Sequence, residues 1–232
     1  MRINRYIAQC GVGSRRKCDE YITKGLIKVN GKIKTNFSYN VKKDDYVQFN
    51  NRLIEPLDLE TYILNKPKGY ICTKKDNLKR KIIYDLLPDK SLFSIGRLDY
   101  DTTGIILVTN DGDLSYKLTH PKFNVKKKYI VLTDGKLLKN DIKSISNGLR
   151  IDKNKILKAN ITYLCKVHNK YEWDIILTEG KNREIKRIFN YFDINVIKLH
   201  RYEFAGITLK NTSIGKYRKI NKEEKRKLES LF

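Results

Sequence analysis

Residues 96–104, Gly-Arg-Leu-Asp-Tyr-Asp-Thr-Thr-Gly, form the densest group of reactive side chains in this sequence. Asp99 lies two residues from Arg97, and a nearby cation favours the ionised form of a carboxyl group. An ionised carboxylate can act as a nucleophile at a sugar carbon, as in retaining glycoside hydrolysis. A polar loop between two glycines, followed by the apolar run 105–108, is typical of a rigid support for catalytic groups. The segment is therefore a candidate active-site loop in which Asp99 could act as a nucleophile, although the pair alone is a weak signal.

Two other interpretations of this loop remain open at the level of the residues. An Arg–Asp pair in a loop is more often a structural ion pair than a catalytic one. Asp99 and Asp101 could together bind Mg²⁺, but such a site usually takes further oxygen ligands. The next acidic residues, Asp111 and Asp113, follow a predicted strand, so we expect no metal site.

Residues 59–232 have the pattern of a larger α+β domain that positions this loop. Apolar runs and alternating residues predict strands at 62–64, 105–109, 129–133 and 171–178, with turns at 65–69 and 110–112. Ile185, Ile188 and Phe189 recur at helical spacing and predict a helix that faces the core. Strands outnumber helices, and no βαβ repeat is evident. We therefore expect a mixed, mostly antiparallel sheet flanked by helices.

Residues 1–58 have the pattern of a separate, small basic domain, joined to the rest by a linker at 56–60. The spacing of Ile3, Tyr6 and Ile7 predicts a short helix. Ser14 is a favourable N-cap for a second helix, which we expect to end near Gly25. The Asn-Gly pair at 30–31, between alternating residues, predicts a hairpin.

The charge of the chain points to an anionic partner. Lys and Arg number 49 against 26 Asp and Glu, a formal net charge of +23. A compact protein with this charge repels itself unless an anion offsets it. A bias towards Lys codons would raise Lys, but it would not explain why the acids are so outnumbered. The composition therefore favours nucleic-acid binding.

Cysteine, histidine and hydropathy patterns argue against several other classes of protein. The four cysteines form no C-x-x-C pair and the three histidines are scattered, so we expect neither a zinc site nor a disulfide framework. We find no apolar run as long as the ~18 residues of a membrane span, and the first residues lack the apolar core of a signal peptide. We expect reduced thiols and a cytoplasmic, bacterial-type protein.

Beyond these general patterns, the sequence resembles the RsuA-type pseudouridine synthases. Gly-Arg-Leu-Asp-x-x-Thr-x-Gly at 96–104, followed by four apolar residues and Thr-Asn, is similar to the signature of that family. Three other segments are similar to family motifs: Lys-Pro-Lys-Gly at 66–69, Lys-Tyr-Ile-Val at 128–131, and Glu-Gly-Lys-Asn-Arg-Glu-Ile-Lys-Arg at 179–187. Residues 1–58 resemble an S4 RNA-binding domain. The resemblance covers essentially the whole chain.

The resemblance implies a fold, a reaction and roles for particular residues. It implies a pseudouridine synthase fold in 59–232 and the isomerisation of a uridine in ribosomal RNA, with no cofactor. Asp99 would be the nucleophile, attacking either the ribose or the base ring. Tyr129 would stack on the base, and Lys186 would pair with Asp99. Lys186 stands where the family has Arg or Lys, and Lys binds as a point charge rather than as a planar fork. Arg97 would help to open the RNA.

We also expect a set of RNA contacts and a monomeric protein. The expected RNA-binding residues are Arg2, Arg5, Ser14, Arg15, Arg16, Lys17, Asn30, Lys66, Lys68, Lys126, Lys127, Lys128, Lys181, Arg183 and Arg187. We favour large-subunit (23S) over small-subunit (16S) rRNA as the substrate. The substrate would be free rRNA or a ribosome-assembly intermediate.

Two hypotheses from other classes are weighed against the enzyme. A non-catalytic RNA-binding or ribosome-assembly factor would have the same charge and the same N-terminal domain, but it would have no need for Asp99 facing a polyanion. A metal-dependent nuclease would cleave RNA in a reaction that EDTA stops.

The start of the second predicted helix generates a testable prediction about RNA binding. Arg15, Arg16 and Lys17 follow the cap directly, although cations at a helix N-terminus are unfavourable by about 0.3–1 kcal/mol each. If these residues contact phosphates, replacing each with Ala will reduce the slope of log affinity against log salt by about one unit. RNA titrations at several salt concentrations measure this slope, and an unchanged slope would show that they are only solvated charges.

Overall fold

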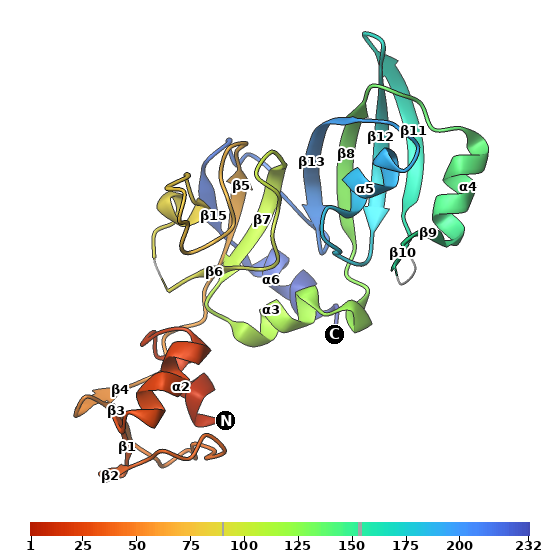
Figure 1. The fold of residues 1–232 in the computed structure, drawn as a ribbon. Coiled ribbons are helices and arrows are strands. Elements are labelled where there is room, and N and C mark those ends of the chain that lie inside the picture. Colours follow the sequence, from red (N-terminus) through yellow and green to blue (C-terminus); the bar gives the residue numbers. More distant parts are fainter. Residues whose placement is uncertain (90, 153–154) are drawn as a thin grey trace. The chain divides into compact units, whose positions relative to one another are not determined.

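A computed structural model describes residues 1–89, 91–152 and 155–232 and divides the chain into two compact units (Figure 1). Unit 1 is Met1–Glu60 and unit 2 is Thr61–Phe232. The expected linker at 56–60 falls within unit 1, where the Leu57 amide donates a hydrogen bond to the Gln9 carbonyl (3.0 Å). Each unit has its own hydrophobic core, as an independently folding domain requires.

Unit 1 has two helices and one small antiparallel sheet. Its elements are α1 (Ile3–Gln9), α2 (Arg15–Thr23), β1 (Ile27–Val29), β2 (Lys32–Ile33), β3 (Val47–Phe49) and β4 (Arg52–Ile54), with strand order β2-β1-β3-β4. The Ser14 hydroxyl accepts a hydrogen bond from the Lys17 amide (3.3 Å), which confirms the predicted cap. Asn30 and Gly31 have φ values of 50° and 75°, as a tight hairpin turn between β1 and β2 requires.

Unit 2 is built on one long mixed sheet, which confirms the α+β expectation. Its strand order is β11-β12-β8-β13-β7-β5-β15, with β14 paired to β13 and β6 to β7. The elements are β5 (Thr61–Lys66), η1 (Ile83–Leu86), β6 (Phe93–Ser94), β7 (Thr103–Thr109), α3 (Gly112–Thr119), η2 (Pro121–Phe123), β8 (Lys127–Thr133), α4 (Lys139–Gly148), β9 (Leu149–Asp152), β10 (Lys155–Leu157), β11 (Asn160–Val167), β12 (Lys170–Leu177), α5 (Glu184–Asn190), β13 (Val196–Phe204), β14 (Ile207–Thr208), β15 (Tyr217–Lys219) and α6 (Lys222–Glu229).

Strand β7 lies between two hydrophobic cores because it is buried on both faces. Ile106 belongs to the cluster under α4 and α5, whereas Ile105 and Leu107 belong to the cluster under α3 and α6. Figure 1 shows α5 against the strands β8, β12 and β13 and α3 beside the other half of the sheet. Successive side chains of a strand point to opposite faces, so one apolar run fixes helices on both faces.

The two halves of the sheet meet where β13 runs parallel to β7, through only two residue pairs. Arg201 of β13 lies opposite Gly104 of β7 on one side and opposite Tyr129 of β8 on the other. A Cβ at Gly104 would lie 2.2 Å from the Arg201 carbonyl oxygen, and the φ of Gly104 is 106°. Only glycine fits this junction, which places the end of the 96–104 loop one strand away from Tyr129.

The sequence prediction missed one helix that borders the site. Residues 110–112 were expected to form a turn, but Asp111 caps α3 instead: its carboxylate accepts hydrogen bonds from the amides of Asp113 and Leu114. An Asn-Asp-Gly segment fits both a turn and a helix start, and the buried Leu118 decides for the helix by packing into the core.

The helices described in this structure include none that could cross a membrane, since each is too short or too polar.

The close approach of β7 and β13 predicts that adding one methyl group at Gly104 will strongly destabilise unit 2. Gly104→Ala should lower the free energy of unfolding of unit 2 by about 2–4 kcal/mol, because a strained φ and an overpacked contact each cost about 1–3 kcal/mol. Urea unfolding followed by the fluorescence of Trp173, the one tryptophan of the chain and fully buried in unit 2, measures this.

Gly112→Ala is the matched control for this test. A Cβ at Gly112 would meet nothing within 4 Å, so the free energy of unfolding should stay within about 0.5 kcal/mol of wild type. Equal stability of the two glycine variants would contradict the account of the junction.

Candidate active site

The side chain of Lys66, the last residue of β5, binds the loop that carries Asp99 through hydrogen bonds. Lys66 is fully buried. Its ammonium donates hydrogen bonds to the carbonyls of Asp99 (2.9 Å), Thr102 (2.8 Å), Pro67 (3.2 Å) and Tyr100 (3.4 Å). Burial lowers the pKa of Lys66, and the negative charges of nearby acidic groups oppose that shift. The carbonyls of the loop thus converge on one ammonium group, which fixes the backbone conformation of the loop.

Two further contacts fix the same loop against the turn at 66–69 and the segment after it. The Gly69 amide donates to the Tyr100 carbonyl (2.8 Å), and φ at Gly69 is 85°. The Leu98 amide donates to the Cys72 sulfur (3.4 Å). The backbone on both sides of Asp99 is therefore tied down, whereas within the described part of the chain no group donates a hydrogen bond to its carboxylate.

Lys186 reaches this loop from α5 and lies between two carboxylates. Its ammonium lies 2.5 Å from both carboxylate oxygens of Asp101 and 3.9 Å from Oδ2 of Asp99. Burial raises the pKa of the Asp101 carboxyl, but the hydrogen bonds and charge of Lys186 outweigh it, so the net shift is downward. Lys186 therefore forms the expected ion pair with Asp99, but its hydrogen bonds go to Asp101.

The four residues expected to be catalytic line one pocket of unit 2. Arg97 and Asp99 come from the loop before β7, Tyr129 from β8 and Lys186 from α5. Arg97 is exposed, Tyr129 is 7% exposed, and the Asp99 side chain is one-third exposed. A carboxylate, a tyrosine ring and two cations thus converge on one space that a ligand can enter.

Lys127 lies at the wall of this pocket and is nearly buried. Its ammonium donates to the carbonyls of Val125 (3.0 Å) and Thr178 (3.3 Å). Burial first, and then the charge of Arg201, lower the pKa of Lys127 to about 8. A lysine with this environment organises backbone carbonyls, as Lys66 does on the other side of the site.

Glu184 and Arg201 also line the pocket from its buried side. Glu184, the first residue of α5, accepts a hydrogen bond from the Lys181 amide (3.0 Å), and burial raises its pKa. Arg201 donates through Nε to the Ile105 carbonyl (2.8 Å). Among the described residues, Oε1 of Glu184 and Nη2 of Arg201 have no hydrogen-bond partner. These groups hold α5 and the strands around the pocket in place.

The structure corrects the sequence prediction for two of the expected RNA-binding residues. Lys66 and Lys127 are buried, and their ammonium groups already donate to backbone carbonyls, so neither can reach a phosphate from this conformation. Asn30 is exposed, but its amide is engaged with Asp45 (2.8 Å) and with the Tyr46 backbone (3.1 Å). The sequence shows the charge or polarity of these residues but not their partners.

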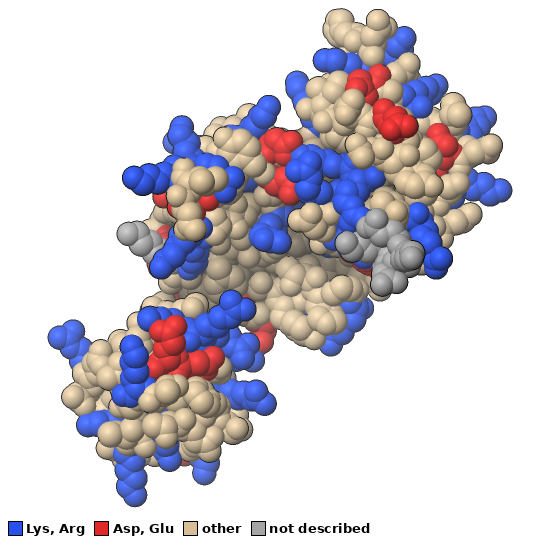
Figure 2. Space-filling view, viewed as in Figure 1, with Lys and Arg blue, Asp and Glu red and all other residues tan. Residues whose placement is uncertain are grey.

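Most of the other expected RNA contacts lie at the surface. On unit 1 these are Arg2, Ser14, Arg15, Arg16 and Lys17, with Arg5 half-buried; on unit 2 they are Lys68, Lys126, Lys181 and Arg183, with Lys128 and Arg187 half-buried. Lys17 is paired with Glu20 (2.6 Å) and Lys128 with Glu203 (3.1 Å). On the face shown in Figure 2, Lys and Arg side chains gather along the hollow between β7 and α5, beside a small group of acidic side chains.

The described residues contain no group of three or more His, Cys, Asp or Glu side chains that could hold a metal ion. Asp101, the second member of the possible Asp99–Asp101 metal pair, is bound to Lys186 instead.

Comparison with known proteins agrees with this geometry. Residues 60–191 match the RNA pseudouridylate synthase family, and residues 1–47 match the S4 domain family. The chain belongs to the RNA pseudouridylate synthase family. The RsuA-type resemblance is thereby confirmed, and a purely RNA-binding role without catalysis is set aside.

Two bacterial enzymes are similar to this pseudouridine synthase over most of their length. It is 35% identical to ribosomal large subunit pseudouridine synthase B of Bacillus subtilis (strain 168), over 99% of this chain and 96% of the relative. It is 34% identical to the dual-specificity RNA pseudouridine synthase RluF of Escherichia coli (strain K12), over 97% and 77%. The crystal structure of a pseudouridylate synthase superposes with a TM-score of 0.68 at 28% identity, covering 98% of this chain and 99% of the other.

Sequence reasoning did not assign Asp101, Glu184 or Arg201 to the site. Asp101 was considered only as a metal ligand, because its partner Lys186 lies 85 residues away. Glu184 was visible as part of the 179–187 motif, but its burial was not. Arg201 carried no local signal, since its position depends on the pairing of three strands.

The lowered pKa of Lys127 predicts a pH effect with a defined sign. The unfolded pKa of lysine is about 10.4, so the cost of burying this cation is full below about pH 8 and disappears as the pH rises towards 10.4. Relative to Lys127→Met, the free energy of unfolding of the wild type should rise by about 1.4 kcal/mol per pH unit between about pH 8 and pH 10.

Urea unfolding of both proteins at pH 7, 8, 9 and 10, followed by Trp173 fluorescence, measures this difference. The exposed neighbour Lys126, changed to Met, serves as the control and should show no such trend. A difference between wild type and Lys127→Met that stays constant from pH 7 to pH 10 would contradict the assignment.

Proposed function

We propose that this enzyme isomerises a uridine of large-subunit ribosomal RNA to pseudouridine, with Asp99 as nucleophile. The observation that carries the proposal is the convergence of Arg97, Asp99, Tyr129 and Lys186 on one pocket, with Lys186 at 3.9 Å from Asp99. The Bacillus subtilis relative is a ribosomal large subunit pseudouridine synthase by name, and it aligns over nearly its whole length. This supports large-subunit rather than small-subunit rRNA.

The proposed reaction begins with extrusion of the target nucleotide. A uridine in a helix must leave the base stack, at a cost of a few kcal/mol. Arg97 is exposed at the pocket and can occupy the space that the nucleotide vacates, while Tyr129 offers its ring to the uracil. Contacts of basic groups with phosphates and of the ring with the base offset the cost of extrusion.

In the chemical step, Asp99 bonds to the nucleoside and the bond between N1 and the ribose breaks. The uracil turns, C5 bonds to the same ribose carbon, and the bond between Asp99 and the nucleoside breaks, which regenerates the carboxylate. C5 loses its proton and N1 gains one. Substrate and product contain the same atoms, so the reaction needs no redox equivalents and no group donor. Lys186 supplies positive charge near Asp99 without neutralising it through a hydrogen bond.

The proposal includes the setting in which the reaction occurs. We propose a monomer, which is supported by the fact that all four residues come from one chain. Unit 1, with the S4 match and exposed Arg15 and Arg16, supplies a second RNA-binding surface. An rRNA substrate, free or in an assembly intermediate, places the enzyme in the cytoplasm.

The test of this function is Asp99→Asn, assayed by mapping pseudouridines in large-subunit and small-subunit rRNA transcripts. The variant should lose activity by roughly a thousand-fold or more, as expected when a nucleophile is removed, while its affinity for RNA stays within twofold. Glu229→Gln, which removes one negative charge from the far end of α6, is the charge-matched control and should convert uridine like the wild type.

Conversion by Asp99→Asn at the wild-type rate would refute the role of this carboxylate. Conversion of small-subunit RNA alone by the wild type would refute the choice of substrate but not the reaction.

A further inference from the structure

Aromatic rings and lysines, most of them exposed, gather at the end of α3 and in η2, outside the pocket. We call this group the aromatic–basic surface; it consists of Tyr116, Lys117, His120, Lys122, Phe123 and Phe232. None of these residues belongs to the set that the resemblance assigned to RNA binding or catalysis, and none has a role in the proposed reaction.

The rings contact one another, and the lysines lie over them. The Tyr116 ring centroid is 4.9 Å from that of His120 and 6.0 Å from that of Phe123. The Lys122 ammonium lies 4.6 Å from the centre of the Phe123 ring and 5.4 Å from that of Tyr116. Such cation–π contacts hold a lysine close to an aromatic face without neutralising its charge.

Phe123 is half-buried and packs against the core under α3 and α6, but the other side chains of this cluster lie at the surface. Leu118 provides the buried contact of α3, whereas Tyr116 is 49% exposed and Phe232 is 38% exposed. His120, Lys117 and Lys122 are exposed as well. Contiguous exposed aromatic surface in a folded protein marks an interaction site more often than a structural need, and the lysines on it select an anionic partner.

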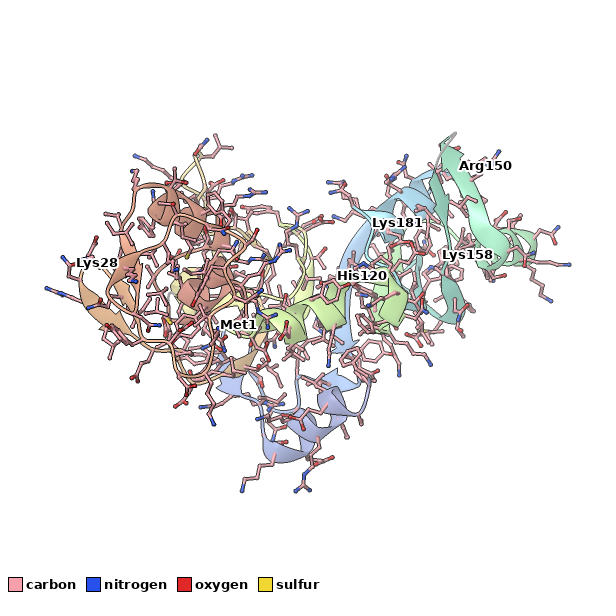
Figure 3. The ribbon with its side chains drawn as sticks, turned by 90° about the horizontal axis from the view of Figure 1, so that it is seen from below. Met1, Lys28, His120, Arg150, Lys158 and Lys181 are labelled. Carbon is pink, nitrogen blue, oxygen red and sulfur yellow. The ribbon has the colours of Figure 1, made fainter. Side chains whose placement is uncertain are left out.

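The aromatic–basic surface adjoins the active-site pocket. Thr119, between Lys117 and His120 in the chain, lines the pocket together with Asp99 and Lys181. Figure 3 shows His120 at the end of α3, on the side of the unit that carries Lys181. Tyr116 and His120 are four residues apart and therefore lie on one side of the helix, next to Thr119. The surface thus lies where an RNA strand bound in the pocket could extend.

We propose that the aromatic–basic surface stacks an unpaired base that flanks the target uridine, with Tyr116 as the main platform. The proposal rests on the proposed function, since it takes RNA as the partner. Every base has a π-face, so a ring can hold a neighbouring nucleotide of any sequence. Lys122, beside the same ring, is placed to contact the phosphate of that nucleotide.

Fluorescence anisotropy with 5′-fluorescein-labelled dodecauridylate tests the platform directly. Tyr116→Ala should weaken binding by about 5- to 150-fold, the range that corresponds to loss of one stacked base. Tyr116→Phe keeps the ring and should bind within twofold of the wild type. Tyr191→Ala removes a tyrosine of equal exposure (51%) at the end of α5 and is the matched control, which should also bind within twofold.

The dependence of affinity on salt separates stacking from charge. Tyr116→Ala should leave the slope of log affinity against log salt unchanged, because no phosphate contact is lost. Lys122→Gln should reduce that slope by about 0.7. As a second measurement on the unaltered protein, ultraviolet crosslinking to RNA that contains 5-iodouridine should modify the peptide carrying Tyr116 and His120.

Wild-type affinity in Tyr116→Ala, equal losses in the Ala and Phe variants, or the absence of a crosslink at this peptide would each overturn the proposal. These measurements do not depend on conversion of uridine. If the wild type converts no rRNA uridine, the proposed function fails while the stacking result stands. If Tyr116→Ala binds RNA normally, the stacking proposal fails while the proposed function stands.

Discussion

The candidate active site depends on the buried ammonium group of Lys66, whose four hydrogen bonds go to backbone carbonyls. Moving an ammonium group out of water costs several kcal/mol, and Lys66 recovers this through four backbone carbonyls, three of which belong to residues 99–102. Hydrogen bonds to a charged group contribute about 1.5–3 kcal/mol each. Asp99 is therefore presented by a loop whose carbonyls converge on one charge, so its position is fixed before any RNA binds.

The second constraint is the junction between β7 and β13. Gly104, Arg201 and Tyr129 lie side by side on three adjacent strands, and the absent side chain of Gly104 lets the Arg201 backbone approach closely. The loop of Asp99 ends at this glycine. The separation between the loop of Asp99 and the Tyr129 ring is thus set by the register of the sheet.

The sequence predicted those features whose causes are local. Ser14 caps a helix and Asn30-Gly31 forms a hairpin because both depend on a few adjacent residues, and the family motifs located Asp99, Tyr129 and Lys186. Lys66 and Lys127 were assigned to RNA because a lysine far along the chain from its carbonyl partners looks like any other lysine. Their burial depends on contacts between distant segments, which one sequence without relatives does not record.

The contacts of Lys186 distinguish Asp99 from Asp101 as the proposed nucleophile. The two carboxylates lie two residues apart in one loop, and a single lysine faces both. Lys186 gives its hydrogen bonds to Asp101 and stands 3.9 Å from Asp99, outside hydrogen-bond distance. The carboxylate of Asp101 therefore accepts the hydrogen bonds of Lys186, whereas Asp99 has the positive charge of Lys186 nearby without accepting a hydrogen bond from it. This difference in contacts supports Asp99 rather than Asp101 as the proposed nucleophile.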